Sequence, residues 1–141
     1  MFRTSLLTAA FTAGCLTTVS AATIDFRATM TGKAEVPPTT STGSGDVLAT
    51  LDTSTKKLSY TMTYSGLSGP ATAAHFHGPA AAGANAGVAV PIGTNPPSPT
   101  TGSVTLTDAQ IADLEAGKWY ANVHTADNKG GEIRGQMMQV K

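Results

Sequence analysis

Cysteine and charge are both scarce in this chain. Its 141 residues contain one cysteine, Cys15, and only 13% of them are charged. If the first 22 residues are removed, no thiol remains, which excludes a disulfide scaffold and a thiol enzyme. The rest of the chain must then be held together by an ordinary hydrophobic core, and about 120 residues suffice to bury one.

A basic surface is also missing. Without Arg3, eight basic residues stand against nine acidic ones, a formal charge of −1. Nucleic acid or an anionic membrane would require a cluster of Lys and Arg, so we expect neither as a partner. After residue 22, no apolar run approaches the roughly 20 residues that cross a bilayer, so we expect no transmembrane segment there.

Residues 1–22 have the features of a secretory signal peptide. Arg3 supplies the positive charge, a mostly apolar or small segment follows, and Val19 and Ala21 are small residues before a cleavage site near Ala22. We therefore expect a domain over residues 23–141 that is periplasmic or extracellular. A minor alternative is lipoprotein anchoring at Cys15, because Ala13-Gly14-Cys15 is similar to the end of a lipoprotein signal.

Short runs of alternating apolar and polar residues predict a mainly β fold. Gly, Pro and Asn clusters separate the runs, as expected for an antiparallel, Greek-key-like β-sandwich or barrel. The expected strands lie at residues 24–30, 47–51, 58–64, 73–77, 88–92, 102–106, 118–125 and 132–138. The last two are expected to form a hairpin, and we find no linker that would divide the chain.

One short helix is predicted at about residues 107–116. Thr107 and Gln110 have the spacing of a capping box, in which each side chain binds the other residue's backbone N–H. Ile111 and Leu114 then provide an apolar stripe, and Gly117 suits the left-handed conformation that ends a helix.

All three histidines fall in two of the predicted strands. His75 and His77 share one face, about 6.5–7 Å apart along the chain, while Phe76 between them points into the core. On the other strand, Trp119 and Val123 point inward, so His124 points away from the core. If the two strands are neighbours, the three imidazoles converge.

Three converging imidazoles form a candidate metal site. Neutral imidazole suits zinc, copper, iron and nickel, and three protein nitrogens with one open position are a known catalytic arrangement. The alternative is that His75, His77 and His124 are ordinary polar residues that hydrogen-bond to loops.

Other reactive groups point to structure rather than catalysis. Glu132 and Arg134 share a strand face, and we expect them to pair with each other or with Glu35. Met137 and Met138 alternate in direction, so at most one sulfur can face the histidines, and packing is expected for these side chains. No paired carboxylates, Ser/His/Asp order or phosphate-binding loop stands out, which favours a protein that is not an enzyme.

Five ordered motifs stand out along the chain: Gly32-Lys33-Ala34-Glu35-Val36-Pro37-Pro38, Ala74-His75-Phe76-His77-Gly78-Pro79-Ala80, Leu114-Glu115-Ala116-Gly117, Trp119-Tyr120-Ala121-Asn122-Val123-His124-Thr125 and Gly131-Glu132-Ile133-Arg134-Gly135-Gln136. Together they resemble the CHRD domain, a family named for chordin and widespread in bacterial exported proteins. The similarity covers residues 24–140. It implies an extracytoplasmic β-sandwich or barrel with no well-established enzymatic activity. A weaker resemblance links the histidine pattern to the copper ligands of Cu/Zn superoxide dismutases, which use six histidines and a disulfide.

Three functions follow, in order of preference. The first is an exported, non-catalytic CHRD binding module that holds copper or zinc through His75, His77 and His124. The second is a structural or protein-interaction domain without metal, with residues 79–99 as its contact loop. The third is a copper-dependent redox enzyme of the superoxide dismutase type.

Overall fold

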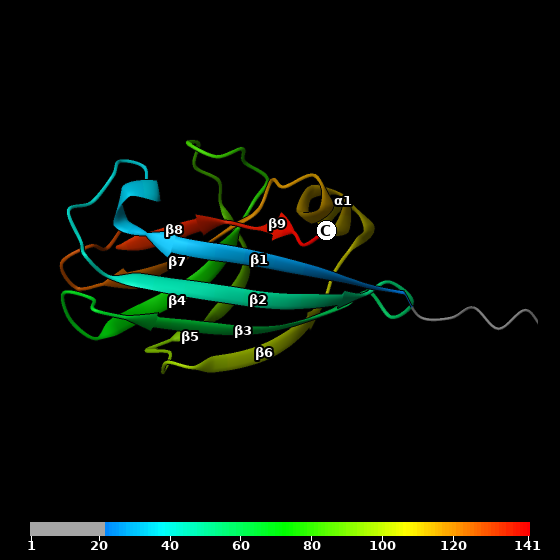
Figure 1. Cartoon of the computed structure of the whole chain (residues 1–141), viewed down its shortest axis with the longest axis horizontal. Helices are drawn as coiled ribbons and strands as arrows, with labels where there is room; N and C mark the ends of the chain where they lie inside the picture. The colour runs from blue at the N-terminus through cyan, green and yellow to red at the C-terminus, as the bar shows by residue number, and fades with distance from the viewer. Residues whose placement is uncertain (1–21) are drawn as a thin grey trace, which may run out of the picture.

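The computed structural model describes residues 22–141, which form nine strands, an α-helix and a 3-10 helix (Figure 1). The predicted signal peptide, except Ala22, and the possible lipidation of Cys15 lie outside these residues. In chain order, the elements are β1 (Thr23–Thr31), η1 (Gly32–Ala34), β2 (Ser44–Asp52), β3 (Lys57–Ser65), β4 (Ala71–His77), β5 (Val88–Thr94), β6 (Thr100–Thr105), α1 (Asp108–Glu115), β7 (Tyr120–Thr125), β8 (Ile133–Gln136) and β9 (Met138–Gln139).

The strands form one rolled antiparallel sheet. Their order is β5-β4-β7-β8-β1-β2-β3-β6, and β9 pairs with β1 outside this path. The chain crosses from one part of the sheet to another between β3 and β4, between β5 and β6, and, through α1, between β6 and β7. The rolled sheet nearly closes into a barrel. Closure is incomplete, because the described residues show no pairing between the terminal strands β5 and β6. The predicted mainly β, antiparallel fold is confirmed.

Alternation along the strands builds the core as predicted. Alternate residues of β1, β2 and β3 point inward, and nine of these side chains are at most 9% exposed, whereas Ile24 and Tyr64 toward the strand ends are partly buried. Phe76 of β4 is fully buried and meets the Tyr60 ring edge-on at 5.2 Å between centroids. Trp119 packs beside Phe76 at 6.0 Å. The inward residues of β1 to β3 are Phe26, Ala28, Met30, Val47, Ala49, Leu51, Leu58, Tyr60 and Met62.

Helix α1 also follows the prediction. Thr107 and Gln110 form both bonds of the capping box, and Gly117 ends the segment with a φ of +69°. Leu114 is fully buried beneath the helix. Within residues 22–141, no helix combines the length and hydrophobicity that crossing a membrane requires.

The predicted strand over residues 132–138 is wrong at its end. Strand β8 pairs with β7 as the expected hairpin, but it stops at Gln136. The backbone N–H of Met137 donates to the Trp119 carbonyl, and its side chain is fully buried. Met138 then pairs with β1 and is 57% exposed, so the core contact of Met137 interrupts the strand.

A buried carboxylate holds the loops at one end of the barrel. Glu132 is fully buried just before β8. Its Oε1 accepts hydrogen bonds from Ser41 Oγ and the Ser68 backbone N–H, each at 2.7 Å. Its Oε2 accepts from Ser68 Oγ at 2.7 Å, Thr125 Oγ1 at 2.6 Å and Asn128 Nδ2 at 3.3 Å. Glu132 therefore joins segments that are far apart in the sequence.

These donors determine the ionisation of Glu132. Burial alone would raise the pKa of its carboxyl group, but the hydrogen bonds from Ser41, Thr125 and Ser68 outweigh burial and lower the pKa to about 2. The expected ion pair between Glu132 and Arg134 is wrong. Hydroxyl and amide donors already occupy the Glu132 oxygens, so no ion pair with Arg134 forms. The ion pairs among residues 22–141 are Arg27–Asp46 and Lys56–Asp108.

We expect Glu132→Gln to destabilise the protein by about 2–4 kcal/mol at pH 7, because its amide nitrogen would face donors inside the fold. Because the folded pKa of Glu132 lies below the reference value of 4.5, its stabilisation is present above pH 4.5 and is lost as the pH falls toward 2. The difference between variant and wild type should therefore shrink over this range.

Urea unfolding monitored by tryptophan fluorescence between pH 3 and pH 7 measures both effects. Glu115→Gln, which changes an exposed carboxylate on α1, is the matched control. Equal stabilities of the two variants at pH 7 would contradict the role given to Glu132.

Candidate metal centre

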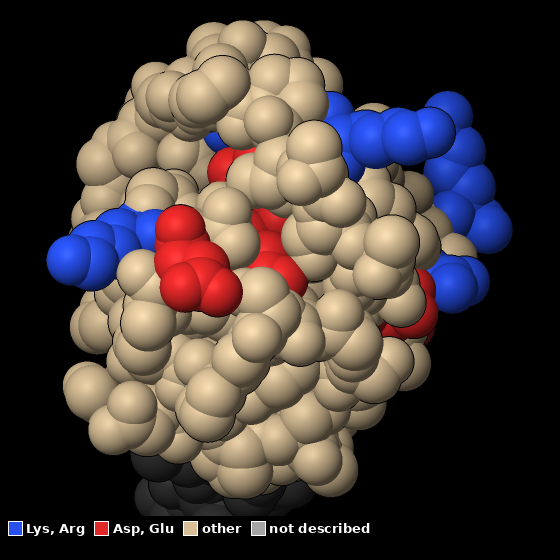
Figure 2. Space-filling model, turned by 90° about the vertical axis from the view of Figure 1, so that its left-hand side faces the viewer, with Lys and Arg blue, Asp and Glu red and all other residues tan. Residues whose placement is uncertain are grey.

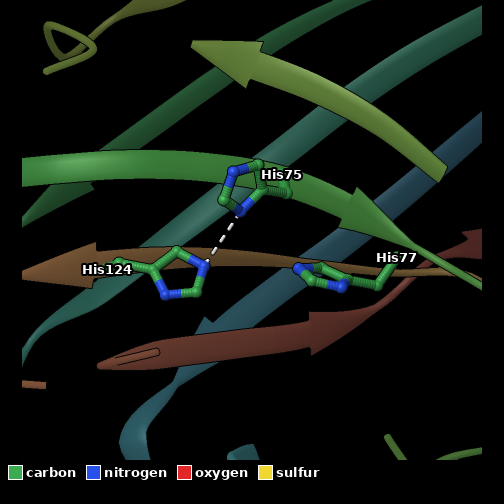
Figure 3. Close-up of side chains that lie close together, drawn as sticks. All are labelled: His75, His77 and His124. Carbon is green, nitrogen blue, oxygen red and sulfur yellow. Dashed lines mark hydrogen bonds between the residues drawn. The ribbon is translucent and has the colours of Figure 1, made fainter. Parts of the chain in front are cut away.

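The pairing of β4 with β7 brings the three histidines together. These strands are antiparallel neighbours, with Ala73 opposite His124 and His75 opposite Asn122. Opposed residues of an antiparallel pair project from the same face of the sheet, so both strands direct their imidazoles to one place. Figure 3 shows the three rings facing one another across the two strands.

The ring nitrogens are close enough for a shared ion with a small adjustment. His75 Nδ1 and His124 Nε2 are 3.0 Å apart, and one nitrogen from each of the three rings lies within 4.8 Å of the others. Two ligands bound at 2.0–2.1 Å are at most about 4.2 Å apart. The shortest distance suits adjacent positions on one ion, while the longest requires a ring to move inward by less than about 1 Å.

Irregular pairing accompanies the histidines on β4. Against β5, the register shifts between Ala74 and His75 and again between Phe76 and His77. Such bulges change the direction of the side chains beside them and are common near functional sites. Here they flank each histidine of β4, while Phe76 stays in the core.

Backbone carbonyls orient two of the three rings. His77 Nδ1 lies 3.0 Å from the Ala86 carbonyl, and His124 Nδ1 lies 2.9 Å from the Lys129 carbonyl. A carbonyl oxygen only accepts, so each Nδ1 carries the proton and each neutral ring keeps a lone pair on Nε2. Contacts of this kind fix the ring orientation of histidines that bind metals.

The surroundings also favour neutral imidazoles. Burial lowers the pKa of His75, and the neighbouring His124 and His77 rings lower it further. Burial is also the largest cause of the lowered pKa of His77, against the opposing effect of its bond to Ala86. Because a metal binds only the neutral ring, these shifts extend the pH range over which ligands are available.

Beside the histidines lies a buried polar layer that the sequence analysis missed. Tyr120 and Asn122 alternate with the inward residues of β7 and share the outer face with His124, yet they are only 3% and 2% exposed. The His77 ring stacks on Tyr120 at 4.8 Å, and the Arg134 guanidinium lies 3.4 Å from the centre of the Tyr120 ring. The outer face of β4, β7 and β8 is therefore a second packed layer.

The loop at residues 84–86 covers part of this layer. Arg134 donates to Asn85 Oδ1 at 2.9 Å and to the Ala84 carbonyl, and the Tyr120 hydroxyl donates to the Ala86 carbonyl at 3.2 Å. Alternation along β7 accounts for the outward direction of Tyr120. It gives no indication that a loop folds back over this side chain.

Glu35 lies buried next to the same layer. It is 5% exposed, and its Oε1 is a buried oxygen without a hydrogen-bond partner within the described part of the chain. Burial raises the pKa of Glu35, and the Arg134 charge opposes this effect without an ion pair. Figure 2 looks onto this end of the barrel, where acidic atoms show in hollows between uncharged residues.

The geometry defines a class: an antiparallel β-barrel module with a cluster of three histidines on the outer face of one strand pair. Comparison with known families gives the second step. The sequence model of the CHRD domain matches residues 26–137, so the chain belongs to the CHRD domain family, as its motifs indicated. No curated protein and no solved structure matches the chain.

Substitution of Gly131 tests how tightly the layer beside the histidines is packed. Gly131 has a φ of +127°, and a Cβ added there would collide with Glu35 Oε1 and Asn122 Nδ2. We expect Gly131→Ala to cost at least about 2 kcal/mol, because it combines backbone strain with overpacking. Gly130→Ala is the control, since a Cβ at Gly130 meets nothing within 4 Å. Chemical denaturation compares the two, and similar midpoints would show that the layer is loose.

Proposed function

We propose that this protein is an exported CHRD-domain binding module that holds one transition-metal ion, copper or zinc, through His75, His77 and His124. The observation that carries the proposal is the convergence of the three rings from adjacent strands. Export is supported by the features of residues 1–22 in the sequence.

The contacts around the rings support binding by neutral nitrogen donors. Carbonyl oxygens hold the Nδ1 protons of His77 and His124, which leaves each Nε2 as the available donor. His75 presents Nδ1 to His124 at 3.0 Å, so in the metal-free protein the proton shared between these nitrogens lies on His75. Binding of an ion through His75 Nδ1 requires this proton to move to Nε2 of the same ring, which gives the other neutral tautomer.

Copper or zinc fits this donor set better than calcium or magnesium. Imidazole nitrogen is a borderline ligand that zinc and copper favour, whereas calcium and magnesium select oxygen. The site would hold the ion at the edge of the buried layer, with each ring half-buried.

Titration of the purified protein with Cu(II) and with Zn(II) tests the proposal. We expect one ion per chain, and a loss of affinity greater than about 100-fold in the variant with His75→Ala, His77→Ala and His124→Ala, which lacks every ring donor. Binding should also raise the melting temperature by several degrees, since an ion at 100 times its Kd adds about 2.7 kcal/mol. Affinity should decrease at acidic pH, because protons compete for the rings, and the lowered pKa values of His75 and His77 shift this decrease below the reference histidine value of about 6.5.

Met138→Leu is the matched control, because it removes an exposed thioether outside the histidine cluster. It should bind as the wild type does. Equal binding by the wild type and the triple variant would refute the metal site. An unchanged melting temperature with stoichiometric metal would favour the alternative of an interaction domain without metal.

A further inference from the structure

We infer that Asn122 supplies a fourth, oxygen donor to the proposed three-histidine site and thereby makes it selective for Zn(II) and Cu(II) over Cu(I). This inference rests on the proposed function. It starts from the Asn122 side chain, whose Oδ1 lies 3.1 Å from His77 Nε2. Asn122 lies on β7, directly opposite His75 of β4 and two residues before His124.

The contact between Asn122 and His77 joins two acceptors. The Ala86 carbonyl holds the proton of His77 on Nδ1, so Nε2 of the neutral ring offers only a lone pair. An amide oxygen also offers only lone pairs. While the His77 ring is neutral, these two acceptors face each other with no hydrogen between them and repel. Either a proton on Nε2 or a metal ion bound to both atoms removes the repulsion.

Glu35 favours the amide orientation that creates this contact. Glu35 Oε1 and Asn122 Nδ2 both lie within 2.7 Å of the point where a Cβ on Gly131 would stand, so the amide nitrogen is on the side of the Glu35 carboxyl group. Reversing the amide would put Oδ1 beside the buried carboxyl oxygens. Gly131 leaves the space in which the Glu35 and Asn122 side chains meet.

Two of the distances suit adjacent ligands of an ion. Ligands at about 2.0–2.1 Å that are 3.0–3.1 Å apart subtend angles near 95° at the ion, as adjacent ligands do. His75 with His124, and His77 with Asn122, each form such a pair. Because one nitrogen from each of the three rings lies within 4.8 Å of the others, an ion held by the rings would have Asn122 Oδ1 beside its His77 ligand.

An amide oxygen changes which ion the site prefers. Oxygen ligands suit harder divalent ions, whereas Cu(I) prefers soft ligands and gains little from an amide. The site with Asn122 should therefore favour Zn(II) and Cu(II) more strongly than three imidazoles alone. Ag(I) serves as a redox-inert probe for the preference of Cu(I).

The test is titration of the full chain and of two variants with Zn(II) and with Ag(I). Asn122→Ala should weaken Zn(II) binding about 10-fold or more, because a ligand matters at least as much as the outer-shell contacts that are worth 10–100-fold. Its Ag(I) affinity should change by less than about 3-fold. Asn122→Asp, which keeps an oxygen at the position, should retain or increase the ratio of Zn(II) to Ag(I) affinity.

A loss of both ions to the same extent in Asn122→Ala, or no loss of Zn(II), would overturn the inference. If Asn122→Ala does not fold, the affinity ratio of Asn122→Asp decides alone, and a ratio below that of the wild type counts against an oxygen ligand. A wild-type chain that binds neither ion marks the failure of the proposed function itself, whereas loss of selectivity alone does not.

Discussion

The Glu132 carboxylate is the constraint on which the loop end of the barrel depends. A buried charge is stable only where enough donors replace water, and Glu132 receives five hydrogen bonds from Ser41, Ser68, Thr125 and Asn128. These donors belong to the β1–β2 and β3–β4 connections and to the β7–β8 hairpin. Fixing the hairpin also fixes the Lys129 carbonyl, which orients the His124 ring. The Glu132 carboxylate thus influences the orientation of His124 through the hairpin that connects them.

The sheet also determines the site because its two faces pack differently: one completes the core and the other carries the histidines. Inward residues of β4 and β7, among them Phe76 and Val123, complete the hydrophobic core. Their outward neighbours would normally meet solvent, but Tyr120 and Arg134 are covered by loop 84–86. The histidines lie at the edge of this covered layer and remain half-buried. That position provides partial desolvation together with access for a ligand.

Much of the fold could be predicted, and less of the site. Period-two alternation gives each main strand and the inward direction of Phe76, and the capping box gives α1, because these signals are local. The identity of the site residues on each strand is local too. The register between strands is not a local property. Ala73 faces His124 only because β4 and β7, whose residues are 43 or more positions apart in the sequence, pair in this register. Burial of Asn122 and Glu35 depends on loops folding back, for which alternation carries no signal.

The independence of core and site bears on what a metal could do here. In small zinc domains, the ion replaces a core and the chain is unfolded without it. This barrel has a continuous apolar core from β1 to β8 that excludes all three histidines, so an ion is not needed in place of a core. An ion at the histidines would instead relieve one local conflict, the facing acceptors of His77 and Asn122. Such a site is suited to reversible binding on a scaffold that is already formed, because the fold and the bound ion need not be lost together.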